Sequence, residues 1–151
     1  MKFTPIKVNL FNLLKLPLAY LGGVRVSAIT DTEVVVTIKH RWMNQNPFNS
    51  MFWAAQGMAA EMTTGVLVMK AIDGSKRKFS MLVTSQEAQF FKKATGCITF
   101  SCKGGNEIRE AMQKSIKTGE GQVVVLTSEG KNNDGIVVSR FQFDWSLKVK
   151  K

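Results

Sequence analysis

The chain has 151 residues, enough for one domain (1–151) with a real core, and it contains no internal repeat or low-complexity tract. Its formal net charge of +10 favours an anionic partner, but the basic residues are scattered among turns, so nucleic acid is not expected. Lys7 and Lys15 interrupt a possible signal peptide, and Gln56 and Glu61 interrupt the apolar run 51–69. We therefore expect a cytoplasmic protein without a membrane partner.

Residues 5–21 predict an amphipathic helix, because Ile6, Leu10, Leu13, Leu14, Leu18 and Leu21 recur at helical spacing. Pro17 should kink or split this helix, and the Gly22-Gly23 pair should end it. The next two runs, 24–29 and 33–39, alternate and predict a hairpin.

The segment 41–49 has the composition of a loop, and Asn49 or Ser50 is expected to cap a helix that runs to about residue 71. This helix is apolar all round, which is typical of a helix enclosed by other structure. Its small residues would let a curved sheet approach closely. Four methionines (Met51, Met58, Met62 and Met69) would either line a flexible acyl tunnel or belong to the core.

Strands dominate the rest of the chain after a turn at 73–75. We predict strands at 79–91 and 98–103, a short helix or irregular excursion at 106–117, and a hairpin of 122–128 with 136–149. The last strand alternates apolar and polar residues, so one face is core and the other faces water. This order predicts an α+β protein in which one antiparallel sheet wraps around one long helix.

The two cysteines and the single histidine indicate neither a disulfide nor a metal site. Cys97 and Cys102 share a predicted strand at an offset of five, which puts them on opposite faces about 16 Å apart, too far for a disulfide. His40 has no second histidine or cysteine at ligand spacing, so no metal site is expected.

Glu61 is the only ionisable side chain between Arg41 and Lys70. A carboxylate in such an apolar helix is seldom buried without a partner or a task. Its apolar neighbourhood should raise its pKa. We interpret Glu61 as the mark of an active site; the alternative is a carboxylate satisfied by hydrogen bonds at a dimer interface.

The order of elements, together with the segment 46–61, resembles the hotdog-fold acyl-CoA thioesterase superfamily, and most closely its phenylacetyl-CoA thioesterase type. In that type an asparagine before the central helix lies fifteen residues ahead of an acidic residue on the helix. Asn46 and Glu61 match this spacing, whereas Phe52-Trp53-Ala54 stands where the family has His-Gly-Gly. The resemblance implies a curved antiparallel sheet around a long central helix, with an extra N-terminal helix in this chain. It also implies a homodimer that joins its sheets, or a tetramer of such dimers.

The resemblance also implies roles for residues. Glu61 would be a general base or a nucleophile, and Asn46 would orient the water or carboxylate across the dimer; otherwise Asn46 is a turn residue before Pro47. Backbone N–H groups of Phe52, Trp53 and Ala54 would polarise the thioester carbonyl. Further substrate contacts are expected from Gln56, Met58, Thr84 and Ser85, and contacts to the CoA phosphates from Arg77, Lys92 and Lys93. The alternative for Gln56, Thr84 and Ser85 is ordinary packing.

The predicted activity is hydrolysis of a fatty or aryl acyl-CoA to free acid and CoA, with no cofactor because CoA arrives in the substrate. The alternative is a non-catalytic protein that binds an acyl ligand, which a pocket blocked by Trp53 would favour. A cone-shaped fold like that of ketosteroid isomerase fits less well, because its long helix usually comes first.

Overall fold

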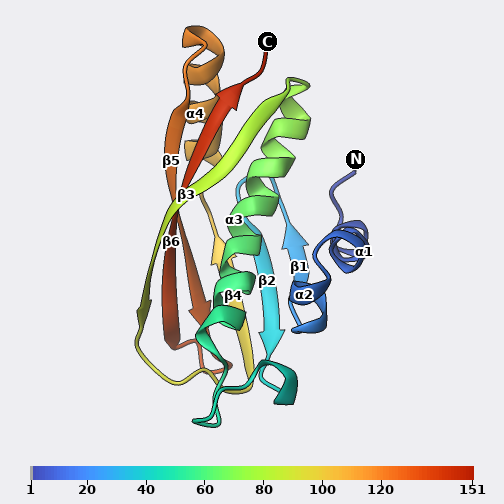
Figure 1. The fold of residues 1–151 in the computed structure, drawn as a ribbon, viewed down its shortest axis with the longest axis vertical. Coiled ribbons are helices and arrows are strands. Elements are labelled where there is room, and N and C mark those ends of the chain that lie inside the picture. Colours follow the sequence, from blue (N-terminus) through green and yellow to red (C-terminus); the bar gives the residue numbers. More distant parts are fainter. Residues whose placement is uncertain (1) are drawn as a thin grey trace.

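The computed structural model describes residues 2–151 and consists of one curved antiparallel sheet with four α-helices (Figure 1). The elements are α1 (Pro5–Lys15), α2 (Pro17–Leu21), β1 (Arg25–Ile29), β2 (Val34–Lys39), a 3-10 turn η1 (Trp42–Asn44), α3 (Trp53–Ser75), β3 (Phe79–Phe90), β4 (Cys97–Cys102), α4 (Gly105–Thr118), β5 (Gln122–Lys131) and β6 (Val137–Val149).

The six strands pair in the order β1-β2-β4-β5-β6-β3, and every neighbouring pair is antiparallel. β1 and β3 are therefore the two edges. In β6 the side chains of Phe141, Phe143 and Trp145 are buried and Arg140 and Gln142 are exposed, as the alternation predicted. The sheet thus has an apolar face that meets α3 and a solvated face.

α3 lies along the apolar face of the sheet and is the long enclosed helix that the sequence predicted (Figure 1). Ala59 and Ala60 are fully buried, which allows the strands to approach the helix closely. Two buried hydrogen bonds fix the helix to the sheet. The Thr63 hydroxyl lies 2.9 Å from the Ser128 hydroxyl, and the Trp145 indole donates to the Thr64 hydroxyl at 2.9 Å.

Both predicted ends of α3 need correction. The helix begins at Trp53 after Phe52 and has no side-chain cap, so the prediction that Asn49 or Ser50 caps it was wrong. Asn49 has a φ of 58° in the preceding turn, and Ser50 is bound to Asn46 there. The helix also continues to Ser75, so 73–75 form its last turn rather than a connecting turn.

The segment predicted as a helix or an irregular excursion is a helix of 14 residues, α4. It packs against β5, β6 and α3 and buries Ile108 and Met112. Its Ser115 hydroxyl accepts a hydrogen bond from the Val149 N–H at 2.9 Å. The sheet therefore packs against α4 as well as the long central helix α3.

The predicted N-terminal helix splits at Leu16, and Pro17 opens the short second helix. α1 packs beside β1, the edge strand. The Asn9 amide donates to the Val26 carbonyl at 2.9 Å and accepts from the Val26 N–H at 2.8 Å. Asn12 is buried, with its amide 3.3 Å from the Met62 sulfur. α1 therefore turns its asparagines inward.

Cys97 and Cys102 are both free thiols, as predicted. Burial raises the pKa of Cys102 to about 11. Among the helices of residues 2–151, none is long and apolar enough to cross a membrane.

Candidate active site

Glu61 lies in the third turn of α3 with a glycine one turn away on each side. A Cβ at Gly65 would lie 3.5 Å from the Glu61 Oε1 and 3.5 Å from the Trp145 ring, and a Cβ at Gly57 would lie 3.4 Å from the Phe141 ring. The carboxylate is thus partly buried between a bare stretch of helix and aromatic rings of β6. Desolvation by burial raises the pKa of Glu61, as the sequence predicted.

An open groove of about 510 Å³ lies at the start of α3. It brings together six residues that the sequence singled out: Asn46, Phe52, Trp53, Gln56, Lys92 and Lys93. Sequence reasoning missed its aromatic wall, formed by Phe48, Phe90 and Phe91. The only signal in the sequence was that Phe90 and Phe91 directly precede two lysines. That signal does not show that the loop carrying Phe48 and the end of β3 meet at one groove.

Asn46 organises the turn before α3. Its side-chain oxygen accepts from the Phe48 N–H at 2.9 Å and the Ser50 N–H at 3.1 Å, and its amide donates to the Ser50 hydroxyl at 3.0 Å. These contacts are those of a turn asparagine, which was the alternative role considered for Asn46 from the sequence. The same contacts hold the wall of the groove in place.

The start of α3 provides free backbone donors. The Phe52 N–H already donates to the Asn44 carbonyl at 2.8 Å. The N–H groups of Trp53 and Ala54 have no acceptor within residues 2–151, as is usual for the first turn of an uncapped helix. The Phe52 and Trp53 rings meet edge to face at 5.9 Å and are half exposed, so they line the groove without closing it.

Gln56 is the buried polar residue of the groove. Its amide nitrogen donates to the Met51 carbonyl at 3.2 Å, whereas its side-chain oxygen is buried without a partner among the described residues. A buried acceptor that is left unpaired is costly, so a ligand donor or water in the groove would satisfy it.

The free donors and Glu61 lie at different levels of α3. Trp53 and Glu61 are eight residues apart on one helix, which corresponds to about 12 Å along its axis. A thioester carbonyl and its attacking water must each lie about 3 Å from their catalytic groups. The free donors and the Glu61 carboxylate are therefore separated along the helix axis.

The remaining predicted residues lie elsewhere. Met58 packs against Gly22, away from the groove. Thr84 sits at a bulge of β3, with its hydroxyl donating to the Asp144 carbonyl at 3.2 Å, and Ser85 pairs with Asp144. Arg77 lines a separate cavity beyond the C-terminal end of α3. Lys92 and Lys93 instead line the groove at the start of α3.

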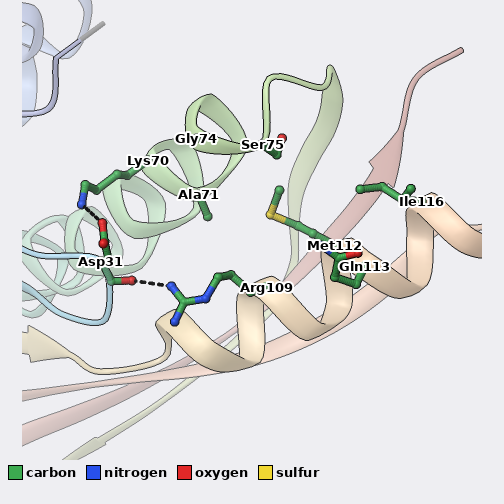
Figure 2. Close-up of a pocket in the computed structure, with 9 residues that line it drawn as sticks. All are labelled: Asp31, Lys70, Ala71, Gly74, Ser75, Arg109, Met112, Gln113 and Ile116. Carbon is green, nitrogen blue, oxygen red and sulfur yellow. Dashed lines mark hydrogen bonds and ion pairs between the residues drawn. The ribbon is translucent and has the colours of Figure 1, made fainter.

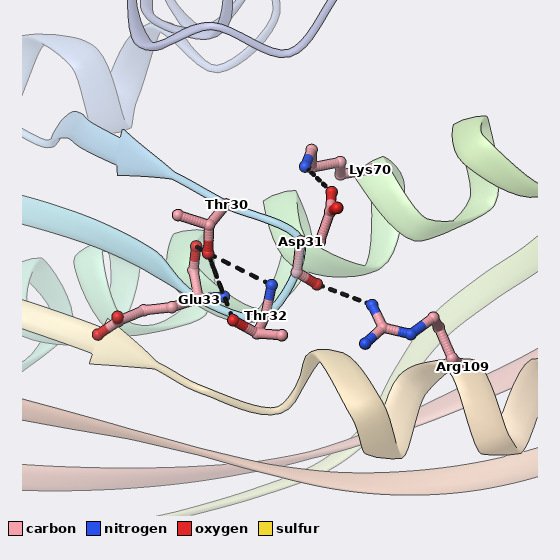
Figure 3. A network of polar contacts seen from close by, with 6 residues as sticks. All are labelled: Thr30, Asp31, Thr32, Glu33, Lys70 and Arg109. Carbon is pink, nitrogen blue, oxygen red and sulfur yellow. Dashed lines mark hydrogen bonds and ion pairs between the residues drawn. The ribbon is translucent and has the colours of Figure 1, made fainter.

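A second cavity of about 290 Å³ lies between α3 and α4 (Figure 2). Its cations already have acceptors: Lys70 pairs with the Asp31 carboxylate, and Arg109 donates to the Asp31 carbonyl at 3.0 Å (Figure 3). The hydrogen bond and charge of Lys70 lower the pKa of Asp31. These contacts tether the β1–β2 turn to both helices. Within residues 2–151 no three His, Cys, Asp or Glu side chains gather to hold a metal ion.

The fold is the hotdog fold of thioesterases. The chain belongs to the family described as a domain of unknown function, DUF4442, whose model matches residues 10–147. No curated protein sequence matches it significantly.

Several solved structures share this fold. A probable thioesterase from Pseudomonas aeruginosa superposes with a TM-score of 0.83 at 19% identity over 97% of both chains. A protein of unknown function from Chlorobaculum tepidum superposes with a TM-score of 0.82 at 16% identity over 98% of both chains. A thioesterase from Staphylococcus aureus, solved as a glutamine variant, superposes with a TM-score of 0.66 at 15% identity over 87% of this chain and 98% of that chain.

Proposed function

We propose that the protein is an acyl-CoA thioesterase that hydrolyses a fatty or aryl acyl-CoA to the free acid and CoA, acting as a homodimer. The observation that carries this proposal is Glu61. It is a partly buried carboxylate on the central helix, with no hydrogen-bond partner among the described residues and a pKa raised by desolvation. A raised pKa makes the carboxylate a stronger base and so a better acceptor for a proton from water.

The distance between the free donors and Glu61 favours a site shared by two subunits. β3 is an edge strand of 12 residues whose outer backbone groups are unpaired in the monomer, which makes it suitable for pairing with a second β3. In antiparallel pairing about a two-fold axis the two β3 strands run in opposite directions. With the axis close to the Phe90 end of β3, the start of one α3 would approach the Glu61 of the other subunit.

The proposed reaction is hydrolysis of the thioester by one water molecule. Glu61 accepts a proton from water as the water oxygen bonds to the thioester carbon, and the oxyanion receives hydrogen bonds from the Trp53 and Ala54 N–H groups. The C–S bond then breaks, the proton passes to the CoA sulfur, and the acid leaves. In the covalent alternative, Glu61 itself attacks the thioester carbon and CoA leaves, which forms a mixed anhydride. Water then hydrolyses this anhydride to release the acid.

The substrate contacts follow from the groove. Its aromatic wall and Met51 would hold the acyl or pantetheine portion, and the unpaired Gln56 oxygen would accept from an amide of the pantetheine arm. Lys92 and Lys93 at the rim would bind the CoA phosphates.

The comparisons add support. Two of the three solved structures reported above are described as a thioesterase or a probable thioesterase. The Staphylococcus aureus protein was solved with substitutions at a glutamine and at a glutamate fifteen positions further on, the same separation as Asn46 and Glu61 here.

Thiol release from a panel of short, medium, long and aryl acyl-CoAs tests the activity. Glu61→Gln should lower turnover by about 10² to 10⁴-fold, because it removes the base while keeping the shape of the side chain. An unchanged rate in this variant would remove Glu61 from the mechanism. Circular dichroism and size-exclusion chromatography control for folding and dimer formation.

Trp53→Pro tests the backbone donor. Phe52 has φ −60° and ψ 137°, which suits a residue before proline, and proline is well tolerated at the first position of a helix. The variant lacks the N–H, whereas the matched control Trp53→Ala lacks only the ring. Loss of about 10² to 10³-fold in kcat for Trp53→Pro alone supports the oxyanion role. Equal losses in both variants would assign the effect to the ring.

Mixing Glu61→Gln with Trp53→Pro subunits tests the shared site. If Glu61 of one subunit works with Trp53 of the other, each mixed dimer regains one intact site and turnover reappears. If both groups act within one subunit, no mixed dimer has an intact site, and the mixture stays inactive.

A second candidate is a non-catalytic protein that binds acyl chains. It is favoured by Phe52 and Trp53, whose rings line the groove where the resembling thioesterases carry a histidine followed by a glycine. Thermal stabilisation by fatty acid or acyl-CoA, with no thiol release from any member of the panel, would support this candidate against the first.

A further inference from the structure

The two N-terminal helices carry apolar side chains that the rest of the described chain leaves uncovered. We call it the N-terminal apolar face; its members are Ile6, Leu10, Leu13, Leu14, Leu18 and Leu21. Ile6 is 82% exposed, Leu14 71% and Leu18 74%. An amphipathic helix of a globular protein normally turns such a stripe toward the core. Here α1 turns Val8, Asn9 and Asn12 inward instead.

The exposed apolar surface continues onto η1. The Asn44 amide donates to the Gly22 carbonyl at 2.9 Å, which joins η1 to the end of α2. Trp42 and Met43 on the same turn are exposed, Trp42 to 81%. Trp is the side chain that favours the boundary between lipid and water, because its ring is apolar and its N–H is polar.

The charges around this face have one sign. The first 30 residues contain Lys2, Lys7, Lys15 and Arg25 and no aspartate or glutamate. The first acidic residue is Asp31, in the β1–β2 turn. Lys7 and Lys15 are exposed on α1 itself. A helix with an apolar stripe and basic residues, too short to span a bilayer, is typical of helices that lie in the interface of an anionic membrane.

We propose that the N-terminal apolar face binds the surface of an anionic lipid bilayer. The face is built of aliphatic side chains on two short helices, and none of its members lines the grooves and cavities described above for residues 2–151. Its basic neighbours complement anionic headgroups. A second copy of the chain is a less suitable occupant, because the edge strand proposed for pairing, β3, is at the opposite end of the sheet from β1. The proposal departs from the sequence-based expectation of no membrane partner.

Co-sedimentation with vesicles tests the proposal, using phosphatidylcholine vesicles with about one third phosphatidylglycerol and vesicles of phosphatidylcholine alone. The wild-type chain should sediment with the anionic vesicles and at least about tenfold less with the neutral ones. The triple variant Leu10→Gln/Leu14→Gln/Leu18→Gln should lose about tenfold in binding, since it removes apolar area from exposed positions without touching the core. Raising the salt concentration should weaken binding of the wild type.

Two further variants identify the cause. Lys7→Glu/Lys15→Glu keeps the apolar face and should lose binding to anionic vesicles specifically. Val123→Thr/Val125→Thr removes exposed apolar area from the solvated face of β5 and should bind like the wild type. Circular dichroism confirms folding of each variant.

Wild-type protein that does not sediment with anionic vesicles would overturn the proposal. Equal binding by the wild type and the triple variant would also overturn it, because the contact would then lie elsewhere. Failure to bind vesicles, together with self-association that the triple variant loses in sedimentation velocity, would assign the face to a second copy instead.

Discussion

α3 and α1 are both rich in apolar residues, yet the protein uses them in opposite ways. α3 is enclosed between the sheet, α1, α2 and α4, and most of its side chains from Ala55 to Val68 are buried. α1 lies beside the outer strand β1 with most of its leucines in solvent. The comparison teaches that apolar content alone does not decide which helix becomes core. The available sheet surface and the hydrogen bonds of each helix decide it.

The apolar face of the sheet is already occupied by α3 and α4, so α1 remains at the edge. An edge strand carries unpaired backbone groups, and Asn9 satisfies both the N–H and the carbonyl of Val26. These two bonds require the polar side of α1 to face inward, and the leucines must then face outward.

The largest expected effect separates buried from exposed leucines. Leu67→Ala on α3, where the side chain is 1% exposed, should lower the free energy of unfolding by about 2–5 kcal/mol, because it leaves a cavity in the core. Leu14→Ala on α1 should change it by less than about 0.5 kcal/mol. Urea unfolding of both variants measures the difference. Similar losses in the two variants would mean that the leucines of α1 are covered in solution.

Asn9→Ala should lower the free energy of unfolding by about 1–3 kcal/mol, since it leaves the N–H and carbonyl of Val26 without partners. Hydrogen exchange should show faster opening of α1 and β1 and little change in α3. Lys7→Ala, on the exposed side of α1, is the matched control. Unchanged exchange in Asn9→Ala would show that other contacts hold α1 on β1.

Glu61→Gln should stabilise the protein at neutral pH. The folded-state pKa of Glu61 is raised above its ordinary value of 4.5, so the unfolded chain ionises first as the pH rises, and native stability falls through that window. The glutamine variant avoids this loss. Its Tm should exceed that of the wild type at pH 7, and this difference should shrink as the pH falls towards 4.5 and stay small below 4.5. A difference that does not depend on pH would exclude the titration of Glu61 as its cause.

The smallest expected effect is on the reactivity of the two thiols, which is measured without changing the stability of the protein. Cys102 is buried and burial raises its pKa to about 11, so it should resist an aromatic disulfide reagent at pH 8 in the native protein. The unfolded chain should release two equivalents of reagent thiol. Rapid labelling of a Cys97→Ser variant in the native state would show that β4 opens readily.

Much of the fold was predictable because the relevant signals are local. Alternation in β6, the apolar run of α3, and Pro17 each act through neighbouring residues, and the structure confirms all three. The cap of α3 was not predictable in this way. Asn49 and Ser50 are suitable capping residues, but the turn organised by Asn46 uses them differently, and the helix begins three residues later.

For the site, the sequence identified Glu61 and its raised pKa, because a lone carboxylate among apolar residues is desolvated wherever that helix is packed. It also identified six residues of one groove, but neither the aromatic wall nor the unpaired Gln56 oxygen. Those depend on a loop, a helix start and the end of β3 meeting in space. The outward face of α1 likewise depends on which surface of the sheet was still free and which backbone groups of β1 needed partners. Helical spacing shows that a helix has an apolar side, but only the packed structure shows where that side points.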